Sequence, residues 1–308
     1  MNRALRIHGY GGSNVVRIDQ VPVPNAGPGE VVVRVRAAGV NALDWKIRDG
    51  LMRDAFPVAL PATLGIELAG EISEVGTGVT AFAVGDRVMG PLGGLGAYAD
   101  HAVIAADKLT LTPADLDDVR AAAISIASLT AWQALFEAGE LKRGQTVLIH
   151  GAAGGVGSFA VQFAVRMGAR VVCTAQGVNA SYLRALGADE VIDYRASDFW
   201  KLTNHIDLVL DLVGGTTLAH SWQVLAENGR IVSAAAADIV ATTPQGKRGV
   251  WFQMRPDSEK LAEIANRVAH GDLSVEVSEI ADFAETGAVI ERNKTGHGPG
   301  KAVVTFRQ

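Results

Sequence analysis

Short apolar runs recur at regular intervals through the second half of the chain. They lie at 146–150, 170–175, 190–194, 207–213, 230–236 and 250–254. Apolar residues at helical spacing fill several of the gaps, including 180–188 and 216–227. Strands that alternate with helices in this way predict an α/β fold with a doubly wound parallel sheet. We expect this Rossmann-type domain to span residues 123–271.

The first part of the chain has a different pattern. The stretch "EVVVRVRAAGVN" alternates apolar and polar residues, and "AGEISEVGTGVTAFAVGDRVMG" places short strands between glycine turns. Both are typical of an antiparallel, barrel-like β domain. The segment "KAVVTF" at 301–306 reads as one more strand that has no partner in its own region. We therefore expect a discontinuous β domain formed by residues 1–122 and 272–308.

A glycine-rich stretch, "GAAGGVG" at 151–157, lies between the first apolar run of the sheet and a helical pattern. Strand, glycine turn, helix and second strand form the βαβ context that dinucleotide binding requires. The alternative is a tight turn without a ligand, which is less common in this context. A Walker A loop is excluded, because no Gly-Lys-Ser/Thr follows.

Within this stretch, Ala152, Gly154 and Gly157 form a variant of the dinucleotide fingerprint. Gly154 would let the backbone approach a pyrophosphate, and Gly157 would let the helix pack closely against the strand. The helix start, with Gly155 and Val156, would offer backbone N–H groups and a favourable dipole to the phosphates.

Composition is that of an ordinary globular protein, with 48% hydrophobic and 20% charged residues in 308. A net charge of −5 gives no basic patch for nucleic acid. The single cysteine, Cys173, excludes a disulfide framework and a cysteine zinc cluster, so we expect a buried apolar role. No apolar signal core or membrane-spanning stretch is visible, which favours a cytoplasmic location without membrane partners.

Several motifs together resemble one family over nearly the whole chain. They are "GEVVVRVRAAGVNALDWKIRDG", "LGIELAGEISEVGTGVTAFAVGDRVMG", "LTAWQAL", "HGAAGGVG", "LGADEVIDYR", "DLVGG" and "TGHGPGKAVVTF". In this order they resemble the zinc-independent medium-chain dehydrogenases/reductases, and within them the quinone oxidoreductases and enone reductases. The resemblance implies a GroES-like catalytic domain, a Rossmann domain and an active-site cleft.

The zinc ligands of related alcohol dehydrogenases are missing. Those relatives carry a cysteine ahead of the Asn41–Lys46 region and a histidine in a Gly-His-Glu segment, whereas this chain reads "RAAGVN" and Gly65-Ile66-Glu67. The seven histidines form no metal-binding pattern either, and His150 is expected to be a satisfied strand-end residue. We therefore expect no metal. Without a Lewis acid, alcohol oxidation is disfavoured, while a conjugated carbonyl can be reduced metal-free.

The catalytic candidates lie in "NALDWK". By resemblance, Asn41, Asp44 and Lys46 line the cleft beside the nicotinamide. Asn41 could donate a hydrogen bond to a carbonyl or order a water, and Lys46 could stabilise an oxyanion or relay a proton. The alternative is that Asp44 begins a short helix as its N-cap and Lys46 is merely solvated. No strong general acid is visible, so protonation by solvent fits the pattern.

The resemblance also implies contacts at the nicotinamide end of the cofactor. The candidates are Thr130, Val213, Gly214, Ser233 and Ala234. Each also has a plain structural alternative, because threonine caps or sits inside helices and glycine after a strand forms turns.

The end of the second strand decides between NADPH and NADH. An NAD enzyme usually places an acid there, but this chain reads Thr174-Ala175-Gln176-Gly177-Val178-Asn179. The absence of an acid at Ala175 favours NADPH, although the serine and basic residue common in NADPH-using relatives are also missing. By resemblance, Tyr194 lies near the ribose phosphate, and Arg195 or Lys301 could add positive charge.

These features together predict an NADPH-dependent, zinc-free reductase of quinones or α,β-unsaturated carbonyl compounds, whose partner is a small electron acceptor. The alternative is a binding protein that kept the fold and cofactor site and lost turnover. A homodimer is expected because Val250, Trp251 and Phe252 would leave an apolar edge on the last strand.

Overall fold

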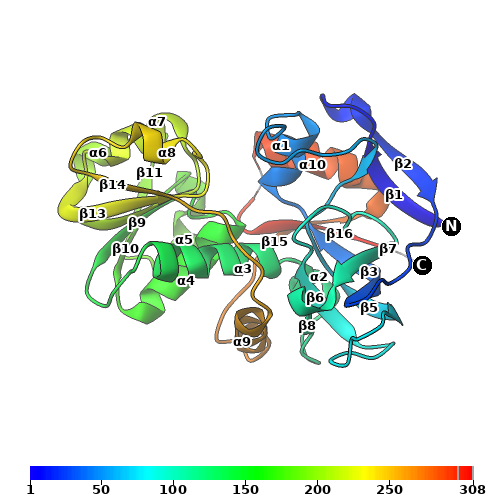
Figure 1. The fold of residues 1–308 in the computed structure, drawn as a ribbon. Coiled ribbons are helices and arrows are strands. Elements are labelled where there is room, and N and C mark those ends of the chain that lie inside the picture. Colours follow the sequence, from blue (N-terminus) through cyan, green and yellow to red (C-terminus); the bar gives the residue numbers. More distant parts are fainter. Residues whose placement is uncertain (297, 307–308) are drawn as a thin grey trace. The chain divides into compact units, whose positions relative to one another are not determined.

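The computed structural model describes residues 1–296 and 298–306, which form two compact units (Figure 1). Unit 1 comprises Met1–Ile126 and Pro256–Gln308, and unit 2 comprises Ala127–Arg255. Unit 2 ends earlier than the expected domain boundary at residue 271. The reason is that the helix α9 (Ser258–Ala269) packs against β8 (Thr110–Leu111) of unit 1.

Unit 2 is built on a six-stranded sheet with the order β11-β10-β9-β12-β13-β14. Its strands are β9 (Thr146–His150), β10 (Arg170–Ala175), β11 (Glu190–Asp193), β12 (Ile206–Asp211), β13 (Leu225–Ser233) and β14 (Arg248–Trp251). All neighbouring pairs are parallel. This confirms the predicted doubly wound sheet, and the order reverses between β9 and β12.

Helices precede the first of these strands and connect the others. They are α3 (Ser125–Trp132) with its π-helical continuation η3 (Gln133–Ala138), α4 (Gly155–Met167), η4 (Gly177–Asn179), α5 (Ala180–Ala185), α6 (Phe199–Leu202), α7 (Gly215–Ser221) and α8 (Ile239–Thr242). The middle of the central strand β9 consists of Val147, Leu148 and Ile149, which are all fully buried. Such a continuous apolar run is expected for a parallel sheet that is covered on both faces. Gly168 ends α4 with a φ of 79°.

One predicted helix is wrong in its second half. The apolar spacing of 216–227 suggested a continuous helix, but α7 ends at Ser221 and β13 begins at Leu225. Val224 and Leu225 are buried in the core of the sheet, so their apolar character serves the strand. Short apolar runs fit either period, and here tertiary packing decides.

Unit 1 contains a seven-stranded sheet with the order β15-β16-β3-β5-β6-β8, in which β7 also pairs with β3, and a three-stranded sheet β2-β1-β4. The strands are β1 (Asn2–Ile7), β2 (Val16–Val21), β3 (Glu30–Gly39), β4 (Ala62–Thr63), β5 (Glu67–Val75), β6 (Arg87–Pro91), β7 (His101–Ala105), β8, β15 (Val277–Asp282) and β16 (Lys301–Thr305). As predicted, β16 returns to the N-terminal domain, where it pairs antiparallel with β3. It also pairs in parallel with β15, so the expectation that it has no partner in its own region is wrong.

The helical elements of unit 1 lie around these sheets. They are η1 (Ser13–Val15), α1 (Ala42–Arg48), η2 (Ala106–Lys108), α2 (Asp118–Ala122), α9, η5 (Phe283–Glu285) and α10 (Thr286–Thr295). Figure 1 shows α1 beside α10, in agreement with their contacts, so segments from the two ends of the chain meet here.

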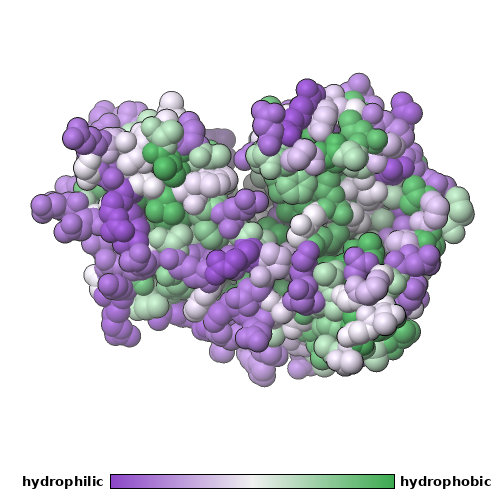
Figure 2. All heavy atoms as spheres, in the orientation of Figure 1, coloured by the Kyte–Doolittle hydropathy of each residue, from purple (hydrophilic) through white to green (hydrophobic). Residues whose placement is uncertain are grey.

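Figure 2 shows one face, on which hydrophilic and hydrophobic residues are interspersed over both units. Across residues 1–296 and 298–306, no helix combines the length and apolar character needed to cross a membrane.

Candidate cofactor and active site

The glycine turn between β9 and α4 contains two glycines with different roles. A Cβ on Gly157 would stand 2.4 Å from the carbonyl oxygen of Gly151 and 2.6 Å from the Cα of Ala152. Only glycine therefore allows the helix to start so close to the strand. A Cβ on Gly154 would meet nothing closer than the same carbonyl oxygen at 3.5 Å, and its φ of −73° suits any residue.

The space beside Gly154 is consistent with a ligand. The protein's own packing does not require glycine there, so the residue leaves room for a group from outside the chain. The first turn of α4 begins at Gly155 and continues through Val156 and Gly157, and its backbone N–H groups have no partners within the helix. An open surface beside a helix N-terminus of this length fits a phosphate.

An acid from the neighbouring strand lies beside the end of the second strand of unit 2. Asp193, the last residue of β11, pairs in register with Ala175, the last residue of β10. Its Oδ2 atom lies 2.5 Å from the point where a Cβ on Gly177 would stand. The prediction that the strand is followed by no acid holds for residues 174–179. It misses Asp193, which places a carboxylate beside these residues from the neighbouring strand. Tyr194 follows Asp193 and is 52% exposed.

Lys301 is not the free positive charge that the sequence suggested for the 2′-phosphate. It lies in unit 1, is 6% exposed, and forms an ion pair with the buried carboxylate of Glu67. Its ammonium group also donates to the Asn41 Oδ1 atom at 2.6 Å. Glu67 therefore neutralises the charge of Lys301 inside this unit.

The same ion pair fixes Asn41. The Asn41 amide nitrogen donates to Glu67 Oε1 at 2.9 Å and to the Gly39 carbonyl at 3.2 Å. Glu67 in turn accepts the backbone N–H of Ile126 at 2.7 Å. Both ends of the Asn41 amide are engaged, so this side chain is held in place and is not the free donor that the sequence suggested.

Asp44 is buried within α1. The helix N-cap is Asn41, whose backbone N–H donates to Asp44 Oδ2 at 2.7 Å, so Asp44 occupies the third helical position and not the N-cap. The Tyr98 hydroxyl donates to the same oxygen at 2.7 Å. The other oxygen, Oδ1, has no hydrogen-bond partner among the described residues. Asp44 is 0% exposed, so it supports the loop and contacts no substrate in this conformation.

Burial shifts the pKa values of both Asp44 and Tyr98. Loss of solvent raises the pKa of Asp44 to about 6, against the opposing effects of the Tyr98 and Asn41 hydrogen bonds and the Lys301 charge. Burial and the neighbouring Asp44 raise the pKa of Tyr98 well above its ordinary value. Unlike Asp44 and Tyr98, Lys46 is only half-buried. Its Nζ atom lies 5.7 Å from the centre of the Trp45 ring.

The remaining candidates lie in unit 2. Val213 is 54% exposed, and Gly214 adopts a φ of 78° at the start of α7. Ser233 is fully buried, and Ala234 after it is half-buried. Thr130 is buried in α3 at 8% exposure. Val213, Gly214, Ser233 and Ala234 are thus brought together at the carboxyl ends of neighbouring strands.

Neither Cys173 nor His150 takes part in a metal site. Cys173 is buried in β10, where burial raises the pKa of its thiol to about 12. His150 is fully buried and bonded through both ring nitrogens, as expected for a satisfied strand-end residue. In the part of the chain that the structure describes, no cluster of three histidine, cysteine or acidic residues could hold a metal.

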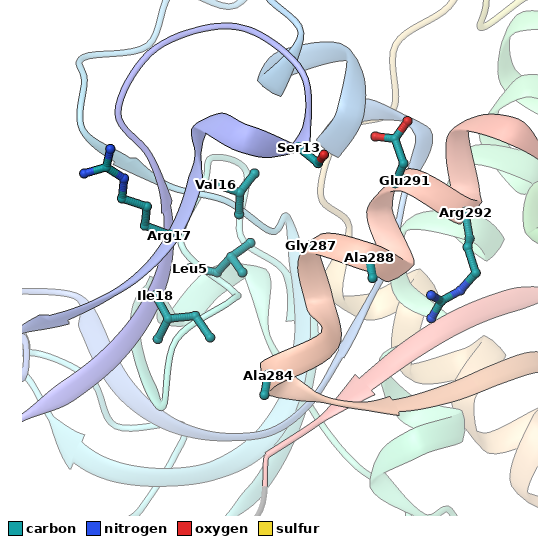
Figure 3. A pocket seen from close by; sticks show the side chains of 10 residues that line it. All are labelled: Leu5, Ser13, Val16, Arg17, Ile18, Ala284, Gly287, Ala288, Glu291 and Arg292. Atoms are coloured by element: carbon teal, nitrogen blue, oxygen red, sulfur yellow. The ribbon is translucent and has the colours of Figure 1, made fainter.

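A separate groove opens on unit 1 between β1, β2 and α10 (Figure 3). It has a volume of about 520 Å³, and its lining includes Gly287 and Ala288 of α10 and Val16 of β2. None of the residues predicted from the sequence lines it.

Comparisons with known proteins agree with this architecture. Residues 27–114 match the alcohol dehydrogenase GroES-like domain family, and residues 186–304 match the zinc-binding dehydrogenase family. A quinone oxidoreductase from Pseudomonas aeruginosa is 35% identical over 92% of this chain and 94% of its own length. A 2-haloacrylate reductase from a Burkholderia species is 36% identical over 83% of this chain and 81% of its own.

The likeness extends to solved structures. The crystal structure of Escherichia coli quinone oxidoreductase complexed with NADPH superposes with a TM-score of 0.89 at 28% identity, covering 99% of this chain and 100% of the other. A parallel six-stranded unit with a glycine turn at its switch point, joined to a GroES-like unit without zinc ligands, defines the zinc-independent medium-chain dehydrogenases/reductases. The chain belongs to the quinone oxidoreductase-like group of this family.

Proposed function

We propose that this protein is an NADPH-dependent, zinc-free reductase of quinones or α,β-unsaturated carbonyl compounds. The observation that carries the proposal is the open space beside Gly154 at the start of α4, where the order of the parallel sheet reverses. Ligands of doubly wound sheets bind at this point, outside the carboxyl ends of the strands. The names of relatives that reduce quinones and 2-haloacrylate support the substrate class.

Specific residues would hold the cofactor. The backbone N–H groups of Gly155, Val156 and Gly157 would bind the pyrophosphate at the helix start. The ends of β12 and β13, with Val213 and Ala234, would border the nicotinamide, and the end of β10 would receive the adenosine ribose. When bound, the dinucleotide supplies the hydride.

Unit 1 would supply the polar groups of the reaction. Lys46 is the candidate for stabilising negative charge on the acceptor oxygen, because its side chain carries a positive charge and the residue is only half-buried. Asn41 would shape the loop around the acceptor, since Glu67 and Lys301 hold its amide. The acceptor would take its proton from solvent, because Asp44 and Tyr98 are buried and bonded to each other.

NADPH is proposed over NADH for two reasons. Residues 174–179 contain no acid, and the Escherichia coli relative was solved with NADPH. Asp193 works against this preference, because its carboxylate lies beside the end of β10. We therefore expect a moderate preference. A cytoplasmic location and a homodimer through β14 remain predictions.

Turnover tests this proposal. Purified protein would be mixed with NADPH and, in separate reactions, a benzoquinone, an open-chain enone and a saturated ketone. Oxidation of NADPH with the first two and not with the ketone is the expected result. NADPH binding without turnover on any acceptor would favour the binding-protein alternative. The variant Lys46→Met should lower kcat and leave the affinity for NADPH unchanged.

A further inference from the structure

Three strands end side by side at the point where the sheet order reverses. The last residues of β9, β12 and β13 are His150, Asp211 and Ser233, and Asp211 is in register with both of the others. All three side chains are 0% exposed. Buried polar side chains therefore lie directly under the edge where a doubly wound sheet binds its ligand.

The Asp211 carboxylate holds the loop that follows its own strand. Its Oδ1 atom accepts the backbone N–H of Val213 at 3.1 Å and that of Gly214 at 2.8 Å. These bonds fix the chain where Gly214 adopts its positive φ of 78°. Its Oδ2 atom accepts the Ser233 hydroxyl at 2.7 Å.

Ser233 extends this hold to the next loop. The same hydroxyl that donates to Asp211 accepts the backbone N–H of Ala235 at 3.1 Å and that of Ala236 at 3.0 Å. The two loops also approach each other, because a Cβ on Gly214 would stand 3.5 Å from that of Ala235. One carboxylate and one hydroxyl therefore set both loops at this edge of the sheet.

His150 does not neutralise Asp211. The Ser221 hydroxyl donates to the Thr217 carbonyl at 2.7 Å, so it can only accept from His150 Nε2, which lies 2.9 Å away. The other ring nitrogen then accepts from the Thr174 hydroxyl at 2.8 Å. This is the neutral imidazole, and burial lowers the pKa of His150 to about 4, against the pull of Asp211. The N–H groups of Val213 and Gly214 and the hydroxyl of Ser233 therefore compensate the buried carboxylate.

We propose that Asp211 is a positioning residue that sets the two loops bordering the nicotinamide end of the cofactor, the first directly and the second through Ser233. This inference rests on the proposed function, which places the cofactor at this edge. Asp211 itself is fully buried and acts only through the backbone of Val213 and Gly214 and the hydroxyl of Ser233.

Two substitutions test the inference from opposite sides. Asp211→Asn keeps one oxygen for Val213 and Gly214 but faces Ser233 with an amide that cannot accept its proton. Ser233→Ala removes the same anchor with a smaller change. Each should weaken NADPH binding, measured by calorimetry, about tenfold, in line with one hydrogen bond to a charged group. The double variant should lose little more than either single one, because both cut the same connection.

A cofactor fragment separates positioning from general damage. Adenosine 2′,5′-bisphosphate carries the adenosine and the 2′-phosphate but no nicotinamide, so both variants should bind it as tightly as wild type does. The matched control is Asp207→Asn, in the same strand, whose carboxylate accepts the Thr146 N–H at 2.8 Å at the opposite end of the sheet. This control should leave the affinity for both ligands unchanged.

Two results would overturn the inference. One is a parallel loss of affinity for NADPH and for the bisphosphate in the folded Ser233→Ala protein. The other is wild-type NADPH affinity in folded variants. A wild-type protein that binds neither ligand would instead refute the proposed function itself.

Discussion

The carbonyl oxygen of Gly151 lies 2.4 Å from the point where a Cβ on Gly157 would stand. Because glycine has no Cβ, the helix after the glycine turn can begin this close to the strand before it. It also separates Gly157, which the fold requires, from Gly154, which has open space beside it. The two glycines therefore make different predictions.

Gly154→Val should fold and lose NADPH affinity. A Cβ at this position meets only the Gly151 carbonyl oxygen at 3.5 Å, whereas the valine side chain would occupy the space assigned to the pyrophosphate. We therefore expect at least a tenfold loss in calorimetry. Gly157→Ala is the contrasting variant, and overpacking should lower the free energy of unfolding by about 1–3 kcal/mol. An unchanged NADPH affinity of folded Gly154→Val would exclude the phosphate-binding role.

Asp44 should make the protein less stable as the pH rises. Its pKa is raised from 3.8 to about 6, so the folded state binds the proton more tightly than the unfolded state does. The stabilisation is complete below the unfolded pKa and is lost as the pH rises through the folded one, in total roughly 3 kcal/mol.

Asp44→Asn tests this effect by difference. Asparagine can keep its oxygen on the Asn41 N–H and the Tyr98 hydroxyl, because both bond to a single oxygen of Asp44. The free energy of unfolding of wild type relative to the variant should therefore fall between about pH 4 and pH 6. Parallel curves for the two proteins would show that Asp44 is not destabilised by burial. His150 has a lowered pKa, which makes stability rise with pH in the same range. This contribution is present in both proteins, so it cancels in the difference between their free energies of unfolding.

Asp193 should limit the preference for NADPH. Asp193→Asn removes a negative charge beside the end of β10, and the NADPH-to-NADH ratio of kcat/KM should rise, by up to about tenfold for a contact of a few kcal/mol before screening. Ala175→Asp is the opposite change and should lower the ratio. If neither variant shifts the ratio, the 2′-phosphate is bound elsewhere.

A dimer would form through the edge of the Rossmann sheet. The strand β14 is the last in the sheet order, and its Val250 and Trp251 are half-buried, whereas Phe252 is buried within the unit and does not form part of the expected edge. Light scattering at micromolar concentration should give twice the chain mass. Val250→Lys should shift this to the monomer, and a wild-type monomer would count against the edge as an interface.

Local sequence patterns were sufficient to predict the parallel sheet of unit 2 and the position of its glycine turn. The apolar runs of β9 and β10 and the glycine turn at 151–157 are contiguous signals, so the parallel sheet and its switch point follow from them. The return of β16 to β3 was predicted correctly, but its premise was wrong, because β16 also has a partner in its own region, the parallel strand β15.

The site could be predicted only in part, because its polar contacts join distant positions. Glu67 meets Lys301, and Tyr98 meets Asp44, across long stretches of sequence with no shared motif. Asp193 reaches the end of β10 from the neighbouring strand, so a search along residues 174–179 misses it. Asp211 did have a signal, since it stands at the end of a strand in "DLVGG".

Hydride transfer from NADPH to a conjugated carbonyl compound is the reaction that we propose for this protein. The most direct measurement uses NADPH labelled with deuterium at the nicotinamide C4 position, an open-chain enone and mass spectrometry of the product. We expect the saturated product to carry one deuterium on its β-carbon when the transferred face of the nicotinamide is labelled. A product without deuterium from either labelled face, or no product while NADPH binds, would contradict this account.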